Sequence, residues 1–242
     1  MSRNAKLIGG FVILVVLAVG VFLFLNRGGT GEASREIEAE EITQEVSGET
    51  ASSGGTIFSI DSTESEVRFT LNEELMGSPT TVVGTTDQVA GQINVDFEQP
   101  SNTILGPITI NVRTLATNSD QRNRQIRQSI LRSAEDAYEF TTFTPTRVEG
   151  LPESITIGEP FTITVAGNLT LVDTTNEVVF EVTITPESET RISGLGTANV
   201  LRSDFNLQIP SVQTVANVTD EVLLEIEFVA VPATAEATEA AS

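Results

Sequence analysis

Residues Phe161–Ile184, FTITVAGNLTLVDTTNEVVFEVTI, carry the clearest strand pattern in the chain. Apolar and polar side chains alternate along both of its arms, and a period of two places the apolar set on one face of a strand. We predict an antiparallel hairpin that turns at Asp173–Asn176, since a one-residue slip would bury the polar set. The pairs expected to face each other on the apolar side are Leu171–Val178, Leu169–Phe180, Gly167–Val182 and Val165–Ile184. This hairpin predicts a sheet that is apolar on one face and polar on the other.

The same alternation recurs along most of the chain between Thr56 and about Pro232. Turn residues separate the runs and no long helices lie between them, which predicts an all-β sandwich or barrel of about eight antiparallel strands. The same pattern disfavours a parallel α/β sheet, whose strands alternate with helices. Besides the hairpin, the expected strands are Thr56–Asp61, Ser65–Leu71, a weak Val82–Val83, Gln88–Phe97, Pro107–Leu115, Glu139–Val148, Thr190–Val200, Phe205–Ile209 and Glu221–Val231.

One segment, Asn118–Ala137, has the composition of a helix instead. Ser119 or Asp120 is suited to cap its N-terminus, and Ile126, Ile130 and Ala134 recur at helical spacing. Two interpretations stay open: a lid whose arginines are solvated or paired with acids, or a cationic mouth that receives an anionic or polar head group. Its arginines are Arg122, Arg124, Arg127 and Arg132.

Composition excludes several classes of function. The chain has no cysteine and no histidine, so thiol nucleophiles, Ser-His-Asp triads and histidine-ligated or thiolate-ligated metal sites are ruled out. From Thr56 onward there are 27 acidic and 9 basic residues, hence a net charge of −18. A domain this acidic repels phosphate backbones, so we expect no nucleic-acid partner. We expect no enzyme, no cofactor and no metal; the oligomeric state is left open.

The ends of the chain differ from the middle. Leu7–Leu25 is a run of 19 uncharged, mostly apolar residues, long enough to cross a bilayer. Two basic residues, Arg3 and Lys6, and no acidic residue precede it. We therefore predict a membrane anchor at 1–27 with the N-terminus in the cytoplasm, an acidic disordered linker at 28–55, a barrel domain at 56–232 outside the cytoplasm, and a disordered tail at 233–242. A secreted protein with a cleaved signal is the alternative.

Five short motifs follow one another along the chain and together cover almost all of residues 57–231. They are Phe58-Ser-Ile-Asp61 with Ser65-Glu-Val67-Arg-Phe69, Gly91–Phe97 with Pro100, Ile110–Thr117 with Arg122, Gly167–Val178, and Arg202-Ser-Asp204-Phe205. In this order and spacing the motifs resemble the YceI-like family of lipocalin-like proteins. The chain departs from the family pattern at Asn123, where an acid is usual, at Asp173, where glycine is usual, and in having no histidine.

The resemblance implies an extended antiparallel lipocalin-like β-barrel whose apolar lumen holds an isoprenoid lipid, such as a polyprenyl lipid or a quinone, to bind, store or shuttle it. The alternative is a non-catalytic interaction module whose barrel is filled by its own side chains. Arg122, Arg124 and Arg127 are the expected head-group contacts. The expected lumen residues are Phe69, Phe97, Ile110, Phe140, Phe161, Leu169, Phe180, Phe205 and Phe228.

Overall fold

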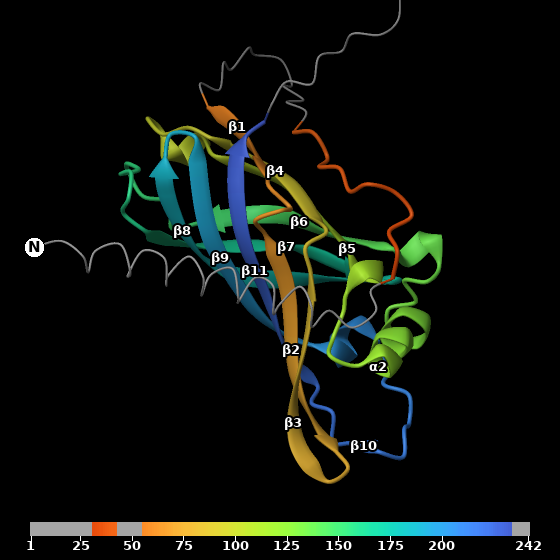
Figure 1. The fold of residues 1–242 in the computed structure, drawn as a ribbon. Coiled ribbons are helices and arrows are strands. Elements are labelled where there is room, and N and C mark those ends of the chain that lie inside the picture. The colour runs from red at the N-terminus through yellow and green to blue at the C-terminus, as the bar shows by residue number, and fades with distance from the viewer. Residues whose placement is uncertain (1–30, 43–54, 234–242) are drawn as a thin grey trace, which may run out of the picture.

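The computed structural model describes residues 31–42 and 55–233 (Figure 1). Most of these residues belong to one antiparallel sheet, and a short helix, α2 (Asp120–Gln125), continues into a π-helical turn at Ile126–Ile130. The strands are β1 (Thr56–Ile60), β2 (Glu66–Leu75), β3 (Ser78–Thr86), β4 (Val89–Val95), β5 (Ile104–Asn111), β6 (Phe140–Glu149), β7 (Phe161–Leu171), β8 (Thr174–Ser188), β9 (Arg191–Leu201), β10 (Val215–Ala216) and β11 (Glu221–Pro232).

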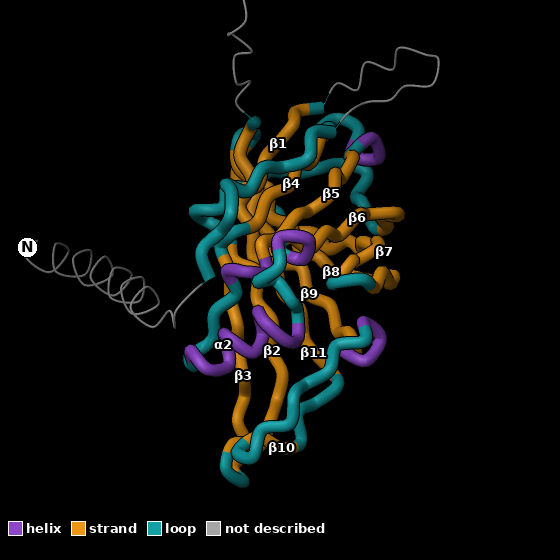
Figure 2. The backbone as a smooth tube through the Cα atoms, turned by 90° about the vertical axis from the view of Figure 1, so that its right-hand side faces the viewer, coloured by secondary structure: helices purple, strands orange, loops and turns teal. Residues whose placement is uncertain are grey.

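The sheet closes into a barrel. Strands follow the order β1-β4-β5-β6-β7-β8-β9-β11, and β11 pairs back to β1 through Phe58 opposite Pro232 and Ile60 opposite Ala230. Closure leaves no open edge in this eight-stranded ring. β2 pairs with β11 next to β1, and β2 and β3 form a hairpin that projects beyond the ring (Figure 1, bottom; Figure 2). The predicted all-β antiparallel barrel with one short helix is confirmed.

The register of the Phe161–Ile184 hairpin differs from the prediction. The turn consists of Val172 and Asp173, so Leu171 lies opposite Thr174 and Val165 lies opposite Phe180. The predicted Leu169–Phe180 pair is therefore wrong, and Leu169 lies opposite Asn176. The error is a shift of four residues, and an even shift leaves every side chain on the face that alternation assigned to it.

Contacts from distant segments select this register. The Asp173 carboxylate accepts hydrogen bonds from the Tyr138 hydroxyl, at 2.9 and 3.1 Å, and pairs with Arg132 at 3.3 Å. Asn176 donates its amide to the Asp204 carbonyl at 2.7 Å. Val172 has a φ of 55°, a conformation that is rare for a β-branched residue, so these contacts offset local strain at the turn.

Three other predicted elements are corrected. Phe205–Ile209 is not a strand, because Arg202–Phe205 forms a 3₁₀ turn and the chain then leaves the sheet. β3 runs from Ser78 to Thr86, far beyond the weak Val82–Val83 signal, since its threonines pair along the whole of β2. The helix predicted over Asn118–Ala137 stops near Leu131, where Arg132 adopts a φ of 53° and the chain turns back.

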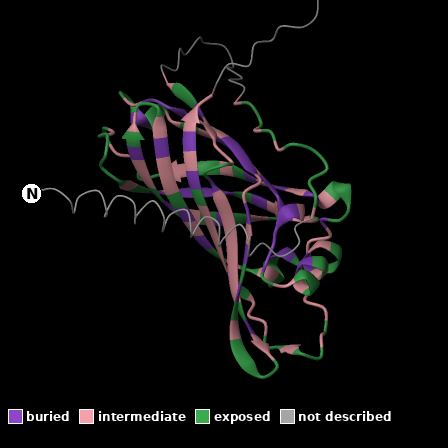
Figure 3. Ribbon diagram, viewed as in Figure 1, coloured by how far each residue is buried: buried purple, intermediate pink, exposed green. Residues whose placement is uncertain are grey.

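The inner wall of the barrel is apolar. Buried residues of the main cluster come from β1, β4, β6, β7, β8, β9, β11 and the 3₁₀ turn at Phe205, and a second cluster gathers around Val89, Ile110, Val112 and Leu115 (Figure 3). Each strand contributes alternate residues to this wall, as the period of two requires. The fold therefore places its apolar side chains around a common axis.

Part of the predicted linker lies against the barrel. We call residues Gly31–Ile42 the strap; it runs along the outside of β4, β5 and β6 (Figure 1, orange-red). The Ile42 N–H donates to Gln92 Oε1 at 3.1 Å, and the Ile42 side chain covers Gly106. At the other end, the Arg35 guanidinium lies 4.6 Å from the centre of the Phe140 ring. These contacts tie the strap to the barrel near both of its ends; the disorder expected for residues 28–55 stays a prediction.

The predicted anchor Leu7–Leu25, the rest of the linker and the predicted tail fall largely outside the described residues. Within the ranges 31–42 and 55–233, no helix is long and apolar enough to cross a membrane.

Candidate functional site: a cavity inside the barrel

A cavity of about 580 Å³ occupies the barrel and extends past its ring of strands. One end is covered by Leu151 and Ile155 of the β6–β7 loop, which the Gly158 N–H ties to the Pro186 carbonyl at 2.7 Å. The other end lies between α2, the β2–β3 hairpin and the segment 207–218. The exposed residues that line the cavity, Asn118, Gln121 and Thr214, are all at this second end. The cavity therefore opens to solvent there, and we call this end the mouth.

The structure places eight of the nine predicted lumen residues on the cavity wall, and their role as ligand contacts stays a prediction. Phe140 is the exception: it points outward, under Arg35 of the strap. Phe143 lines the cavity in its place and meets Phe180 edge-on, with ring centres 5.1 Å apart. Alternation already separates the two phenylalanines, because positions three apart in a strand lie on opposite faces.

Glycines keep the lumen open beside its largest rings. A Cβ at Gly194 would come within 2.6 Å of the Phe228 ring, and one at Gly84 within 2.2 Å of the Phe69 ring. Gly194 and Gly84 are the direct cross-strand partners of these two phenylalanines. Each ring therefore lies flat across a glycine on the neighbouring strand and leaves the centre of the barrel unfilled.

An ion pair stands at the mouth. Glu73 projects inward from β2 with its side chain 6% exposed, and Arg122 of α2 binds it at 2.7 Å. Ser119 caps α2 by accepting a hydrogen bond from the Arg122 N–H, as the sequence predicts, and Arg122 also donates to Asn118 Oδ1 at 3.0 Å. Arg122 is thus held over the cavity with its charge balanced by Glu73, a partner that the sequence analysis did not identify.

The other two predicted head-group arginines do not line the cavity. Arg124 is exposed on the outer side of α2, and the aliphatic part of Arg127 packs against Gly31 of the strap. The face of this helical segment that lines the cavity carries Arg122, Gln125 and Ile126, so Arg124 and Arg127 lie off that face. That the three arginines contact a head group stays a prediction.

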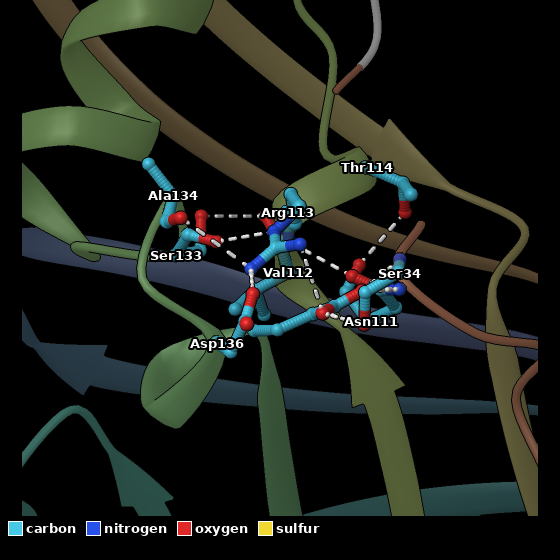
Figure 4. A network of polar contacts seen from close by, with 9 residues as sticks. Ser34, Asn111, Val112, Arg113, Thr114, Ser133, Ala134 and Asp136 are labelled. Atoms are coloured by element: carbon cyan, nitrogen blue, oxygen red, sulfur yellow. Dashed lines mark hydrogen bonds and ion pairs between the residues drawn. The ribbon is translucent and has the colours of Figure 1, made fainter. Parts of the chain in front are cut away.

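A buried polar network joins the strap to the barrel beside the mouth (Figure 4). At its centre is Glu139, fully buried just before β6. Its Oε1 accepts from the Ser34 N–H and from Asn111 Nδ2, each at 2.8 Å, and its Oε2 accepts from the Ser34 hydroxyl and pairs with Arg113 at 3.0 Å. Arg113 continues to the Ser133 carbonyl at 2.6 Å and to Asp136 at 2.8 Å.

The network fixes the charge of Glu139. Burial raises the pKa of this carboxyl, but the hydrogen bonds from Ser34 and Asn111 and the charge of Arg113 outweigh burial and leave the pKa below its usual value. Glu139 is therefore ionised at neutral pH although water does not reach it. Only tertiary structure brings Ser34, Asn111 and Glu139 together, so sequence analysis missed this cluster.

A closed antiparallel β-barrel with an apolar internal cavity and one open end defines a lipocalin-like barrel. Residues 58–230 match the sequence profile of the YceI-like domain, and the chain belongs to this family. No curated protein matches the chain.

Solved structures share the fold at low identity. BcnA of Burkholderia cenocepacia is 21% identical, with a TM-score of 0.55, over 72% of this chain and 99% of its own. A polyisoprenoid-binding domain from Saccharophagus degradans, implicated in plant cell wall breakdown, is 16% identical, with a TM-score of 0.57, over 73% of this chain and 98% of its own. The ligand class expected from the sequence, an isoprenoid lipid, is thus also the one for which this S. degradans domain is named.

Proposed function

We propose that the protein binds an isoprenoid lipid in its cavity, to store or shuttle it without a covalent step. The observation that carries this proposal is the apolar cavity of about 580 Å³, walled by phenylalanine, leucine, isoleucine and valine and open at one end. Membership in the YceI-like family and the fold shared with the S. degradans polyisoprenoid-binding domain support it.

Burial of hydrocarbon supplies the affinity. Each buried CH₂ contributes about 0.8 kcal/mol, so a five-carbon prenyl unit contributes roughly 4 kcal/mol before the cost of ordering the chain. Near the mouth, the Glu73–Arg122 pair offers hydrogen bonds to a polar head group. Several prenyl units in such a lumen suffice for stable binding.

The cavity weighs against the alternative of an interaction module with a self-filled barrel. Protein interiors pack densely, and side chains that filled this lumen would leave no void of this size. The glycines opposite Phe228 and Phe69 remove side-chain volume where a filled core would need it.

The proposal places the barrel outside the cytoplasm, held to the membrane through Leu7–Leu25. The length and apolar character of that run support an anchor, and the basic residues before it support a cytoplasmic N-terminus. A barrel next to the bilayer has direct access to prenyl lipids.

Lipid identification tests the proposal. We expect native mass spectrometry of the full chain, purified in mild detergent, to show a co-purified prenyl lipid. Phe180→Arg places a charge in the lumen and should abolish loading. Val179→Arg is the matched control, because Val179 immediately precedes Phe180 in β8 and is 49% exposed on the outer face. Absence of lipid from the wild-type protein, or equal loading of both variants, would contradict the proposal.

A further inference from the structure

The mouth of the cavity differs in charge from the rest of the protein. We define the rim as residues 73–86, 113–139 and 206–219, the segments that surround the mouth. The rim carries five arginines and six acidic residues, a net charge of −1, whereas the other residues from Thr56 onward carry −17. Residues 75–86 and 206–219 contain no charged side chain at all. The acidic strap also ends beside the mouth, but among residues from Thr56 onward the rim is a nearly neutral end of a strongly acidic domain.

The rim also exposes apolar side chains. Met76, at the tip of the β2–β3 hairpin, is 79% exposed, and Val83 on the same hairpin is 41% exposed. β10 holds the uncharged 206–219 segment against this hairpin, with Val215 opposite Leu75 and the Met76 N–H donating to the Thr214 carbonyl at 2.8 Å. The hairpin and this segment form one supported surface at the mouth.

The strap brings the chain to the same end of the barrel. From Ile42, which lies over Gly106, it runs back to Gly31, where a Cβ would come within 2.6 Å of the Arg113 carbonyl oxygen and 2.8 Å of the Arg127 side chain. Gly31 therefore lies tightly against the segment that forms one side of the mouth. Gly31 is six positions along the chain from Leu25, the end of the predicted anchor, and such a stretch spans at most about 20 Å when fully extended.

We propose that the rim docks on the lipid bilayer, so that the cavity opens directly onto the membrane surface. The proposal rests on the proposed function and on the predicted anchor. Repulsion between anionic lipids and the acidic body turns the nearly neutral rim toward the membrane, and Met76 enters the interface as an apolar contact. A prenyl chain then passes between bilayer and lumen with little exposure to water.

Site-specific labels test the orientation. Because the chain has no cysteine, Met76→Cys and Ile157→Cys each give a single labelling site; Ile157 is an exposed apolar residue, 44% accessible, on the loop that covers the opposite end. The full chain is reconstituted in vesicles of phosphatidylethanolamine and phosphatidylglycerol and labelled with an environment-sensitive fluorophore. We expect lipid-borne quenchers to quench the label at position 76 several-fold more than the label at 157. Equal quenching at both positions overturns the docking.

A transfer assay separates docking from binding. Met76→Asp should slow uptake of a fluorescent prenyl lipid from vesicles several-fold, whereas Ile157→Asp should not, and both variants should reach the wild-type loading in detergent. If wild-type protein and both variants take up lipid at the same rate, the docking proposal is wrong and lipid binding stands. If the label at position 76 enters the bilayer but no lipid loads in detergent, the proposed function is wrong and docking stands.

Discussion

Replacing Glu139 with glutamine tests the buried network at the side of the mouth. The substitution keeps the size of the side chain but removes its charge. All four groups that contact the carboxylate donate hydrogen bonds: the Ser34 N–H and hydroxyl, Asn111 Nδ2 and Arg113 Nη1. A glutamine amide would therefore turn its own NH₂ toward at least one donor, whichever way it is oriented.

The expected loss of unfolding free energy depends on the partners that Arg113 keeps in the variant. Removing one partner of a buried ion pair costs about 3–5 kcal/mol. Arg113 keeps Asp136 and the Ser133 carbonyl, so we expect a loss near the lower limit, about 3 kcal/mol. For a domain of this size each kcal/mol lowers Tm by about 2–4 °C, which gives a decrease of roughly 6–12 °C.

The difference should depend on pH with a defined sign. The pKa of Glu139 is lower in the folded protein than its ordinary value of 4.5, so its stabilising charge is fully present above about pH 4.5 and is lost as pH falls through the folded-state pKa. Thermal unfolding of wild type and Glu139→Gln should therefore differ by a constant amount near neutral pH, and the gap should narrow under acid conditions. Glu159→Gln, on an exposed loop, is the control. A Tm decrease below about 2 °C, or a gap that widens in acid, would refute the reasoning.

Two further substitutions address the strap and the lumen wall. Ser34→Ala removes a charge-assisted hydrogen bond worth about 1.5–3 kcal/mol, so trypsin should cleave after Arg35 about tenfold faster or more. Glu38→Gln, also in the strap, is the control and should leave the cleavage rate unchanged. Equal rates for the wild type and both variants would mean that Ser34 does not hold the strap. Gly194→Val drives a side chain into the Phe228 ring, and overpacking of this kind costs about 1–3 kcal/mol. Both Tm and lipid loading should therefore fall. Unchanged loading would show that Gly194 does not keep the Phe228 ring against the wall.

The sequence could predict the class of fold because alternation is a local property. Period-2 patterning decides which face a residue takes, and an even shift in register does not change that assignment. This is why Leu169, Phe180 and Phe161 line the cavity although the register predicted for their hairpin is wrong by four residues. The same period of two puts Phe140 and Phe143, which are three positions apart, on opposite faces of β6, so the sequence could also have assigned Phe143 instead of Phe140 to the lumen.

The register, the mouth and the network depend on contacts between residues far apart in the sequence. Asp173 is held by Tyr138 and Arg132, 35 and 41 positions away, and the Glu139 carboxylate is held by Ser34, 105 positions away. No local pattern encodes such partners, because their energy appears only when the barrel has closed. Local patterning in the sequence was enough to predict an antiparallel barrel with an apolar inner wall and most of the residues that face inward. Tertiary structure alone decided that the lumen stays open, where it opens, and that the acidic strap ends at its mouth, since packing and long-range hydrogen bonds depend on three-dimensional proximity.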